Sequence, residues 1–252
     1  MSFVDQVVIV TGAARGIGAE YAHAFAQEGA RVLVADVSDG EDTAAKARSL
    51  GVDAAWVRTD VRLRSEADAM VAAALQRWGR VDVLVNNAAR YAGLYRGPLE
   101  SIPPQEWDDV MAVNVRGVWN TTAAVLPSMR AAGSGAIVNI ASTTALKGTA
   151  HNLHYVASKG AVLAATRAIA REVGPHGIRV NCVTPGLVDN EASREGQEDT
   201  FDIRAADRAR ERSLARDMHP VDVVGAVLFL ASEAGAFISG QQLTVDGGGI
   251  FV

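Results

Sequence analysis

The sequence predicts an α/β protein built on one doubly wound parallel sheet of about seven strands, with helices on both faces. Short runs rich in Val and Ile alternate with longer Ala-rich segments along the whole chain, which is the order of β-α-β units. Several of these runs, such as VVIV at 7–10 and VLVA at 32–35, are apolar at every position. Strands that are covered on both faces have this pattern.

Each short apolar run is expected to be a strand and each longer segment a helix. The expected strands are Gln6–Val10, Arg31–Ala35, Ala54–Thr59, Val83–Val85, Ala136–Ile140, Arg179–Val183 and Gln242–Val245. The expected helices are Ile17–Glu28, Glu41–Leu50, Ser65–Trp78, Gln105–Val113, Arg116–Ala131, His154–Val173 and Val221–Ala231. No second domain is expected, so residues 1–252 form one unit. The segment 187–219 breaks the rhythm with many charged residues, and we expect it to be a substrate lid or a mobile loop inserted in that unit.

Composition excludes several classes of function. With 49% hydrophobic and 21% charged residues, the 252-residue chain can bury a sizeable core. Its net charge of −5 argues against a nucleic-acid partner. Neither a signal peptide nor a membrane-spanning stretch is expected, which favours a cytoplasmic location without a membrane partner. The single cysteine, Cys182, excludes an internal disulfide and a cysteine-cluster zinc site, and the scattered histidines predict no metal site.

The stretch TGAARGIG at 11–18 joins the first expected strand to the first expected helix. Gly12, Gly16 and Gly18 permit a sharp turn and a close approach of the backbone to a ligand, and the helix N-terminus offers free N–H groups to a pyrophosphate. A glycine-rich turn also occurs in ordinary strand-to-helix connections. Its place within a β-α-β unit favours a dinucleotide site and a Rossmann fold, and the absence of Gly-Lys-Ser/Thr argues against nucleotide hydrolysis.

Asp36 closes the second expected strand, where a carboxylate can accept hydrogen bonds from the adenosine ribose and repel a 2′-phosphate. This favours NAD over NADP. A strand-end aspartate can also simply cap the next helix, and Arg15 is a competing signal because it could bind a 2′-phosphate. We give Asp36 more weight, because a 2′-phosphate would lie beside its negative charge.

Tyr155 and Lys159 are four residues apart at the start of the long expected helix, so they share one face, about 6 Å apart. A free phenol has a pKa of about 10, and bringing it to about 7 requires about 4 kcal/mol of stabilisation of the phenolate. The lysine ammonium and an oxidised nicotinamide ring could provide it, and Tyr155 could then take a proton from an alcohol. Alone, this pair is usually a surface feature of a helix.

Together these motifs resemble the short-chain dehydrogenase/reductase family from the first strand to the last. The resemblance implies a catalytic tetrad of Asn114, Ser142, Tyr155 and Lys159. It implies that the cofactor is bound by Gly12, Arg15, Gly16, Ile17, Gly18, Asp36, Asp60, Val61, Asn87, Ala88, Tyr155, Lys159, Pro185, Gly186, Val188 and Asn190.

The resemblance also implies a task for each tetrad residue. Ser142 would orient the substrate oxygen and Tyr155 would carry the proton. Lys159 would hold the cofactor ribose and tune Tyr155, and Asn114 would hold a water of the proton relay. The chain departs from the family pattern twice: Ala89 replaces the glycine of Asn-Asn-Ala-Gly, and Asn190 replaces a threonine that contacts the nicotinamide amide.

Substrate contacts are expected from Ser142, Thr144, Asn152 and Tyr155, in a pocket that mixes apolar and polar groups. Further candidate wall residues are Tyr91, Leu94, Tyr95, Leu146, His151, Leu187 and Phe201. The arginines of the 187–219 segment are outnumbered by acidic residues, so a solvated helix with ion pairs is favoured over an acid-binding site.

The leading hypothesis is an NAD-dependent oxidoreductase that interconverts a secondary alcohol and a ketone, with a small hydrophobic or aromatic substrate. One alternative is an NADPH-dependent ketone or 3-oxoacyl reductase, and another is a dinucleotide-binding sensor without turnover. The family resemblance implies a homotetramer, and the apolar C-terminal GGIFV at 248–252 is expected at an interface.

Overall fold

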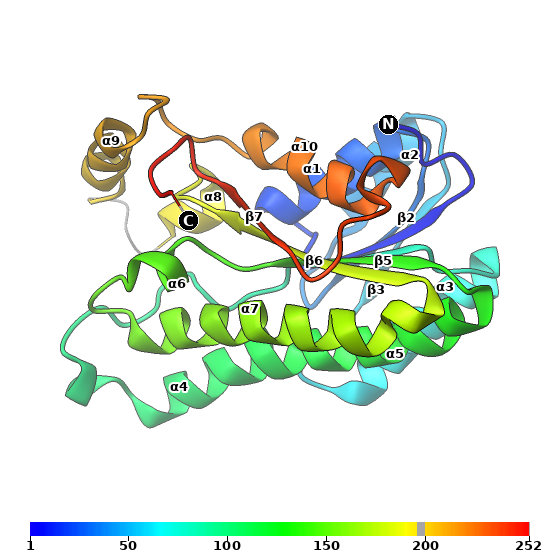
Figure 1. Ribbon diagram of the computed structural model, residues 1–252, viewed down its shortest axis with the longest axis horizontal. Coiled ribbons are helices and arrows are strands. Elements are labelled where there is room, and N and C mark those ends of the chain that lie inside the picture. Colours follow the sequence, from blue (N-terminus) through cyan, green and yellow to red (C-terminus); the bar gives the residue numbers. More distant parts are fainter. Residues whose placement is uncertain (196–199, 252) are drawn as a thin grey trace.

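Seven parallel strands form one sheet in the order β3-β2-β1-β4-β5-β6-β7 (Figure 1). The computed structural model describes residues 1–195 and 200–251. The strands are β1 (Val7–Thr11), β2 (Arg31–Asp36), β3 (Ala54–Arg58), β4 (Val83–Asn86), β5 (Gly135–Ile140), β6 (Ile178–Pro185) and β7 (Gln242–Val245). The predicted doubly wound parallel sheet is confirmed. Because the strand order reverses between β1 and β4, a crevice for ligands opens at their carboxyl ends.

Helices cover both faces of the sheet. The α-helices are α1 (Gly16–Gln27), α2 (Glu41–Ser49), α3 (Arg64–Trp78), α4 (Pro104–Met111), α5 (Gly117–Ala132), α6 (Thr144–Lys147), α7 (Leu153–Val173), α8 (Glu191–Arg194), α9 (Phe201–Glu211) and α10 (Val221–Ala231). The short helices are η1 (Leu99–Ser101), η2 (Ala112–Arg116), η3 (Gly174–His176) and η4 (Glu233–Gly235). In Figure 1, α1, α2 and α10 lie on one face of the sheet, and α4, α5 and α7 lie on the other.

The two faces account for the continuously apolar strands. In β1, Val8 and Val10 pack into the core beneath α1, α2 and α10. Val7 and Ile9 of the same strand pack into the opposite core, with side chains of α3, α5 and α7. All four side chains are fully buried, so none of these four positions favours a polar residue.

Two expected helices are one continuous helical segment. The stretches predicted as Gln105–Val113 and Arg116–Ala131 are α4 and α5, joined without a break by the π-helical turn η2. A π turn inside a longer helix is rare and frequently lies at a functional site. Here it carries Asn114, whose side chain is buried.

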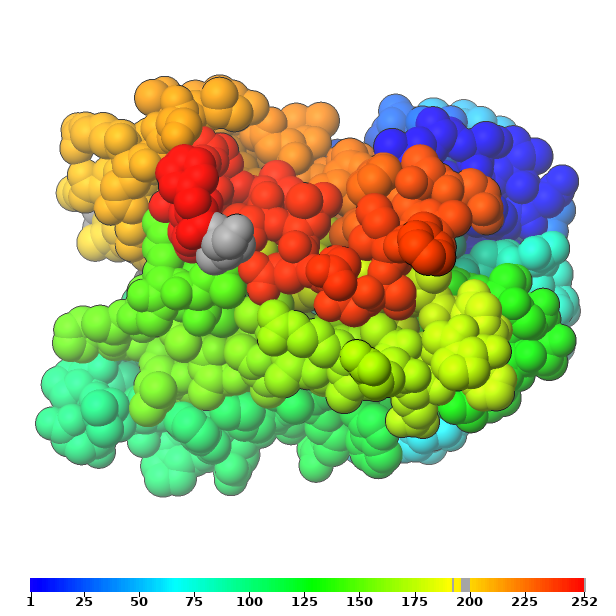
Figure 2. Space-filling model, viewed as in Figure 1, coloured from blue at the N-terminus to red at the C-terminus, as the bar shows by residue number. Residues whose placement is uncertain are grey.

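The 187–219 segment is held together at its base by a parallel bridge between Val188 and Met218. It contains two helices, α8 and α9; the sequence favoured a solvated helix in this segment but gave no bounds for one. Phe201 at the start of α9 is fully buried, with the Arg194 guanidinium 4.5 Å from its ring centroid. Figure 2 shows the segment beside the C-terminal residues, where Leu214 N–H donates to the Gly247 carbonyl at 2.8 Å. Residues 196–199 lie outside the described part of the segment.

None of the helices in the described part of the chain is both long and apolar enough to cross a membrane.

Candidate active site

The glycine turn between β1 and α1 is packed so tightly that its glycines cannot be replaced freely. Gly12 has φ +64°, and a Cβ there would lie 2.6 Å from the Cα of Ala88. A Cβ on Gly18 would lie 2.1 Å from the Gly12 carbonyl oxygen and 2.5 Å from Asn87 Nδ2. Asn87 Nδ2 donates hydrogen bonds to the carbonyls of Thr11 and Gly12, so the turn is fastened to the end of β4.

A cavity of about 400 Å³ opens at this turn, at the carboxyl ends of β1, β2 and β4. Ten of the sequence-predicted cofactor residues line it: Gly12, Arg15, Gly16, Ile17, Gly18, Asp36, Asp60, Val61, Asn87 and Ala88. Pro185, Gly186, Val188, Asn190, Tyr155 and Lys159 line a second cavity. The two cavities share Ile17, Asn87, Ala89 and Tyr91, so they form one continuous surface.

Two of the three arginines that line the first cavity, Arg15 and Arg62, are engaged by carboxylates. Arg15 Nη2 lies 2.7 Å from Glu195 Oε2, and this hydrogen bond raises the pKa of Arg15. Arg62 donates to Asp60 at 2.7 Å and lowers the pKa of that carboxyl. The Asp36 carboxylate accepts hydrogen bonds from the N–H groups of Ala14 and Ser38, both at 2.9 Å.

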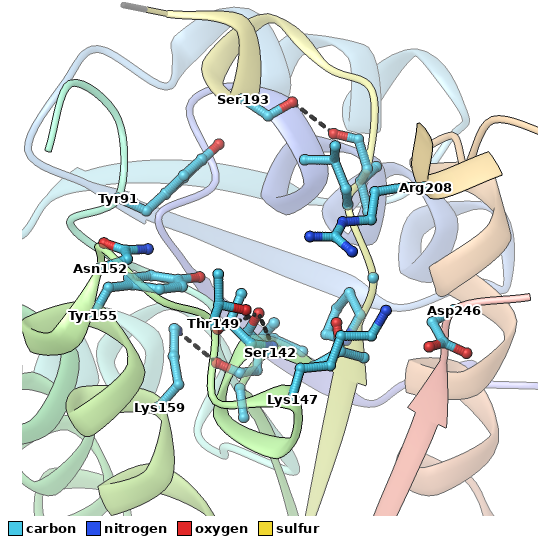
Figure 3. A pocket seen from close by; sticks show the side chains of 18 of the residues that line it. Tyr91, Ser142, Lys147, Thr149, Asn152, Tyr155, Lys159, Ser193, Arg208 and Asp246 are labelled. Carbon is cyan, nitrogen blue, oxygen red and sulfur yellow. Dashed lines mark hydrogen bonds between the residues drawn. The ribbon is translucent and has the colours of Figure 1, made fainter. Parts of the chain in front are cut away.

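Three of the four predicted tetrad residues meet in the second cavity (Figure 3). Ser142 follows β5, whereas Tyr155 and Lys159 lie in the first turns of α7. Figure 3 shows the Tyr155 hydroxyl directed toward Ser142, with Lys159 beneath the ring. Lys159 Nζ is 5.7 Å from the Tyr155 ring centroid and donates to the Ile140 carbonyl at 2.8 Å. Ser142 Oγ accepts a 3.0 Å hydrogen bond from Thr144 Oγ1.

Burial shifts the pKa values of the tyrosine and the lysine in opposite directions. It raises the pKa of Tyr155 to about 12, against smaller lowering effects of the Ser142 hydrogen bond and the Arg96 charge. It lowers the pKa of Lys159 to about 8. The expected lowering of the phenol pKa is therefore not a property of the protein alone, because burial disfavours the phenolate more than the neighbouring groups favour it.

Asn114 is placed differently from the other three. Its Oδ1 accepts a 2.7 Å hydrogen bond from Arg90 N–H, and its Nδ2 donates to Ser158 Oγ at 3.0 Å and to the Arg90 carbonyl at 3.2 Å. It does not line the cavity that holds Tyr155. Asn114 therefore ties the loop after β4 to α7, and its expected place in a water relay stays a prediction.

Both departures from the family pattern line the second cavity. Asn190 is the N-cap of α8: its Oδ1 accepts from Ser193 N–H at 3.1 Å and its Nδ2 donates to the Val188 carbonyl at 3.3 Å. Ala89 lines both cavities, so it lies where they meet.

Only some of the residues predicted for the substrate wall line the cavity. Tyr91, Thr144, Asn152 and Leu187 line the cavity, as does Ser142. Leu94, Tyr95, Leu146, His151 and Phe201 do not. Leu94 and Phe201 are buried in the protein, and Leu146 packs against the small core around Val162. These side chains were selected because they are large and apolar, which is also why they pack into the interior.

The sequence analysis missed a group of cationic wall residues. Arg204, Arg208 and Arg212 of the 187–219 segment line the cavity, together with Arg96 and Lys147. In Figure 3, Arg208 reaches into the cavity from the side opposite Tyr155. The arginine-rich composition was visible in the sequence, but Arg96 lies about a hundred residues away and nothing local indicated that it would join them. Within residues 1–195 and 200–251, no group of three or more histidine, cysteine, aspartate or glutamate residues is arranged to hold a metal ion.

Comparisons with known proteins agree with this arrangement. A family model described as enoyl-(acyl carrier protein) reductase matches residues 12–249. The chain is 39% identical over 248 residues to a cis-4-hydroxycyclohexanecarboxylate dehydrogenase of Sinomonas cyclohexanicum, covering 98% of this chain and 97% of that one. It is 34% identical over 250 residues to a 3-oxoacyl-acyl-carrier-protein reductase of Chlamydia trachomatis serovar D, covering 97% of each.

Among solved structures, the crystal structure of NAD⁺-bound xylitol dehydrogenase superimposes with a TM-score of 0.90 at 29% identity, covering 98% of this chain and 100% of that one. Fold, motifs and relatives therefore agree: this chain is an oxidoreductase-type member of the short-chain dehydrogenase/reductase family.

Proposed function

We propose that the protein is an NAD-dependent oxidoreductase that interconverts a secondary alcohol and a ketone. The observation that carries the proposal is the convergence of Tyr155, Ser142 and Lys159 in a cavity continuous with the glycine turn. The test is the reduction of NAD by a panel of secondary alcohols, followed by absorbance. Turnover of none of them, with intact cofactor binding, would instead favour a dinucleotide sensor.

The residues around the glycine turn suit a dinucleotide. The first turn of α1 contains no acidic residue, and Arg15 at its N-cap makes no capping hydrogen bond with its side chain. The N–H groups of that turn and its positive dipole end are therefore available to a pyrophosphate. When bound, the nicotinamide dinucleotide supplies the hydride acceptor for oxidation and the hydride donor for reduction.

In the proposed mechanism, Tyr155 is the acid and base. In oxidation its phenolate oxygen takes the hydroxyl proton of the alcohol, and in reduction its phenol gives that proton to the ketone oxygen. Ser142 Oγ donates a hydrogen bond to the same substrate oxygen and stabilises its developing negative charge. Lys159 keeps a positive charge beneath the Tyr155 ring and favours the phenolate.

The preference for NAD is supported by the charges of the first cavity. Asp36 lines it at the end of β2, where its carboxylate opposes a 2′-phosphate. Arg15 and Arg62 are already paired with Glu195 and Asp60. The structural similarity to NAD⁺-bound xylitol dehydrogenase also supports a preference for NAD.

An NADPH-dependent ketone or 3-oxoacyl reductase is the second candidate, favoured by the similarity to the Chlamydia reductase. Steady-state rates with NADH and NADPH on one ketone distinguish the two. A 3-oxoacyl reductase acts on a substrate tethered to a carrier. If small free alcohols are turned over as fast as carrier-bound substrates, the first candidate is favoured.

We further propose that the 187–219 segment acts as a lid over the substrate and that the protein is a homotetramer. Phe237 and Phe251 are almost entirely exposed in the isolated chain, as expected of residues that another subunit covers. Sedimentation equilibrium tests the assembly, and a monomer at micromolar concentration contradicts it.

A further inference from the structure

The cavity that holds Tyr155 is strongly cationic, although the chain as a whole has a net charge of −5. Of the described residues that line it, six carry a positive charge and one carries a carboxylate. The cations are Arg96, Lys147, Lys159, Arg204, Arg208 and Arg212, and the carboxylate is Asp246. Asp246 accepts hydrogen bonds from the N–H groups of Gly248 and Gly249, and its charge raises the pKa of Arg212 against the larger lowering effect of burial.

Several of these cations have partners within the protein. Arg212 donates to the carbonyls of Leu187 and Arg216, at 2.8 and 2.9 Å. Lys147 and Arg208 both contact the carboxylate of Glu211. Lys159 is the group already placed beneath Tyr155. Partner groups in the protein thus account for four of the six.

Arg96 and Arg204 are the exceptions. In the part of the chain that the structure describes, neither side chain forms an ion pair with a carboxylate, and Nη1 of Arg204 is buried without a hydrogen-bond partner. Burial lowers the pKa of both, and the charges of Arg96 and Arg208 lower that of Arg204 further. Two guanidinium groups that repel each other in a partly desolvated cavity lower the stability of the fold unless an anion binds between them.

The position of these two arginines excludes the phosphates of the cofactor as that anion. The proposed pyrophosphate site is the N-terminus of α1, in the first cavity, and neither Arg96 nor Arg204 lines that cavity. Both line the cavity of Tyr155 and Ser142, where the substrate binds if the proposed function is correct.

We infer that the substrate carries a carboxylate in addition to the reacting alcohol, and that Arg96 from the loop after β4 and Arg204 from α9 hold this carboxylate. A guanidinium presents a planar pair of N–H donors that matches a carboxylate. Apolar neighbours such as Leu187 and Val188 suit a hydrocarbon body between the two polar ends. This inference rests on the proposed function, and it extends that function from secondary alcohols to hydroxy acids.

The inference also gives the 187–219 segment a task. Arg96 precedes η1 and Arg204 lies in α9, so one carboxylate bound to both would link the lid to the loop after β4. The attraction between the substrate carboxylate and Arg204 would then hold α9 over the site.

The test compares three ketones that differ only at the remote end: 4-acetylbenzoate, its methyl ester and acetophenone. Calorimetric titration of the ketones into the protein saturated with NAD⁺ measures binding without turnover, because the oxidised cofactor has no hydride to give, and the corresponding alcohols measure kcat/KM with NAD. The carboxylate is expected to bind at least about tenfold more tightly than either neutral ketone. Equal affinities for all three overturn the inference, while turnover of the neutral alcohols leaves the proposed function standing.

Variants locate the anion. Arg96→Gln and Arg204→Gln are each expected to reduce the ratio of carboxylate to neutral affinity at least about tenfold. Arg210→Gln is the matched control, because Arg210 lies on the same helix, pairs with Asp207 and does not line the cavity. A loss of preference in Arg210→Gln equal to that in Arg204→Gln overturns the assignment. So does tighter binding of 4-acetylphenyl phosphate than of 4-acetylbenzoate, which would indicate a phosphate site.

Discussion

Lys159 Nζ donates a 2.8 Å hydrogen bond to the carbonyl of Ile140, the last residue of β5. The ammonium group is thus fixed to the carboxyl end of the central sheet, with its side chain 3% exposed. In this position it is a buried charge, and burying a charge costs stability. The first prediction concerns the stability cost of that charge.

Replacing Lys159 by Met should stabilise the protein while it abolishes turnover. Burial lowers the pKa of Lys159 from its ordinary value to about 8, which corresponds to about 3 kcal/mol against the charged form at neutral pH. Leaving the Ile140 carbonyl unpaired offsets about 1–2 kcal/mol of the gain. Thermal unfolding at fixed protein concentration should therefore show Lys159→Met more stable by about 1–2 kcal/mol.

The sign of the pH effect follows from linkage. Between about pH 8 and about pH 10.5 the unfolded state binds this proton and the folded state does not, so the wild type gains stability relative to Lys159→Met as the pH rises. Lys46→Met, at an exposed lysine of α2, is the control and should show no such trend. A Lys159→Met protein that is less stable than the wild type at neutral pH contradicts the argument.

A change of pH should alter kcat/KM for alcohol oxidation and not kcat/KM for ketone reduction. Burial raises the pKa of Tyr155 to about 12, so the phenol needed for reduction is fully protonated at neutral pH. We expect kcat/KM for ketone reduction to stay flat from about pH 6 to about pH 9, and kcat/KM for alcohol oxidation to rise over the same range. Oxidation releases a proton, so the ratio of the two must rise with pH in any mechanism. A flat oxidation profile with falling reduction would mean that Tyr155 is already ionised.

Gly18→Ala should disrupt the cofactor site. The new methyl group would lie 2.1 Å from the Gly12 carbonyl oxygen, and relief requires the glycine turn to move. We expect the Kd for NAD to rise at least about tenfold, measured by calorimetry. Gly225→Ala is the control, because Gly225 is a helical glycine with nothing within 4 Å of its added Cβ. That variant should bind NAD normally and gain about 0.5–1 kcal/mol of stability.

Asp36→Ala should relax the choice of cofactor. Removing the carboxylate removes the repulsion of a 2′-phosphate, so the ratio of kcat/KM for NAD to that for NADP should fall at least about tenfold. Asp39→Ala is the matched control on the same loop, since Asp39 caps the Glu41 N–H and does not line the cavity. An unchanged ratio in Asp36→Ala would mean that Asp36 does not determine the choice between NAD and NADP, and Arg15 would be the next residue to test.

Much of the fold could be predicted because its signals are local. In β1 every side chain is buried on one face or the other, and α10 was placed to the residue because its apolar run is bounded by Pro220 and Ser232. Helix α9 gave a weaker signal that set no bounds, because Phe201 is its one buried residue and its other apolar side chains do not form a buried face. The π turn at Asn114 depends on hydrogen bonds to Arg90, a contact that no local pattern encodes.

The candidate site divides in the same way. The glycine turn, Asp36, Tyr155 and Lys159 were predicted from their places at strand ends and helix starts, and Ser142 was predicted from the family resemblance. The substrate wall was predicted only in part, because a large apolar side chain suits a cavity wall and a protein core equally well. Leu94 and Phe201 are in the core. Whether an arginine faces solvent or a cavity is likewise decided by tertiary packing, as Arg204 illustrates.

The most direct test of the account compares the wild type with Tyr155→Phe in a single turnover of one secondary alcohol with NAD. The ring and its packing are retained, and only the proton-carrying oxygen is lost. We predict that hydride transfer slows by about 10²–10⁴-fold while the Kd for NAD changes less than about threefold. Hydride transfer at the wild-type rate in Tyr155→Phe would contradict the account, because the proposed mechanism has no other group that carries the proton.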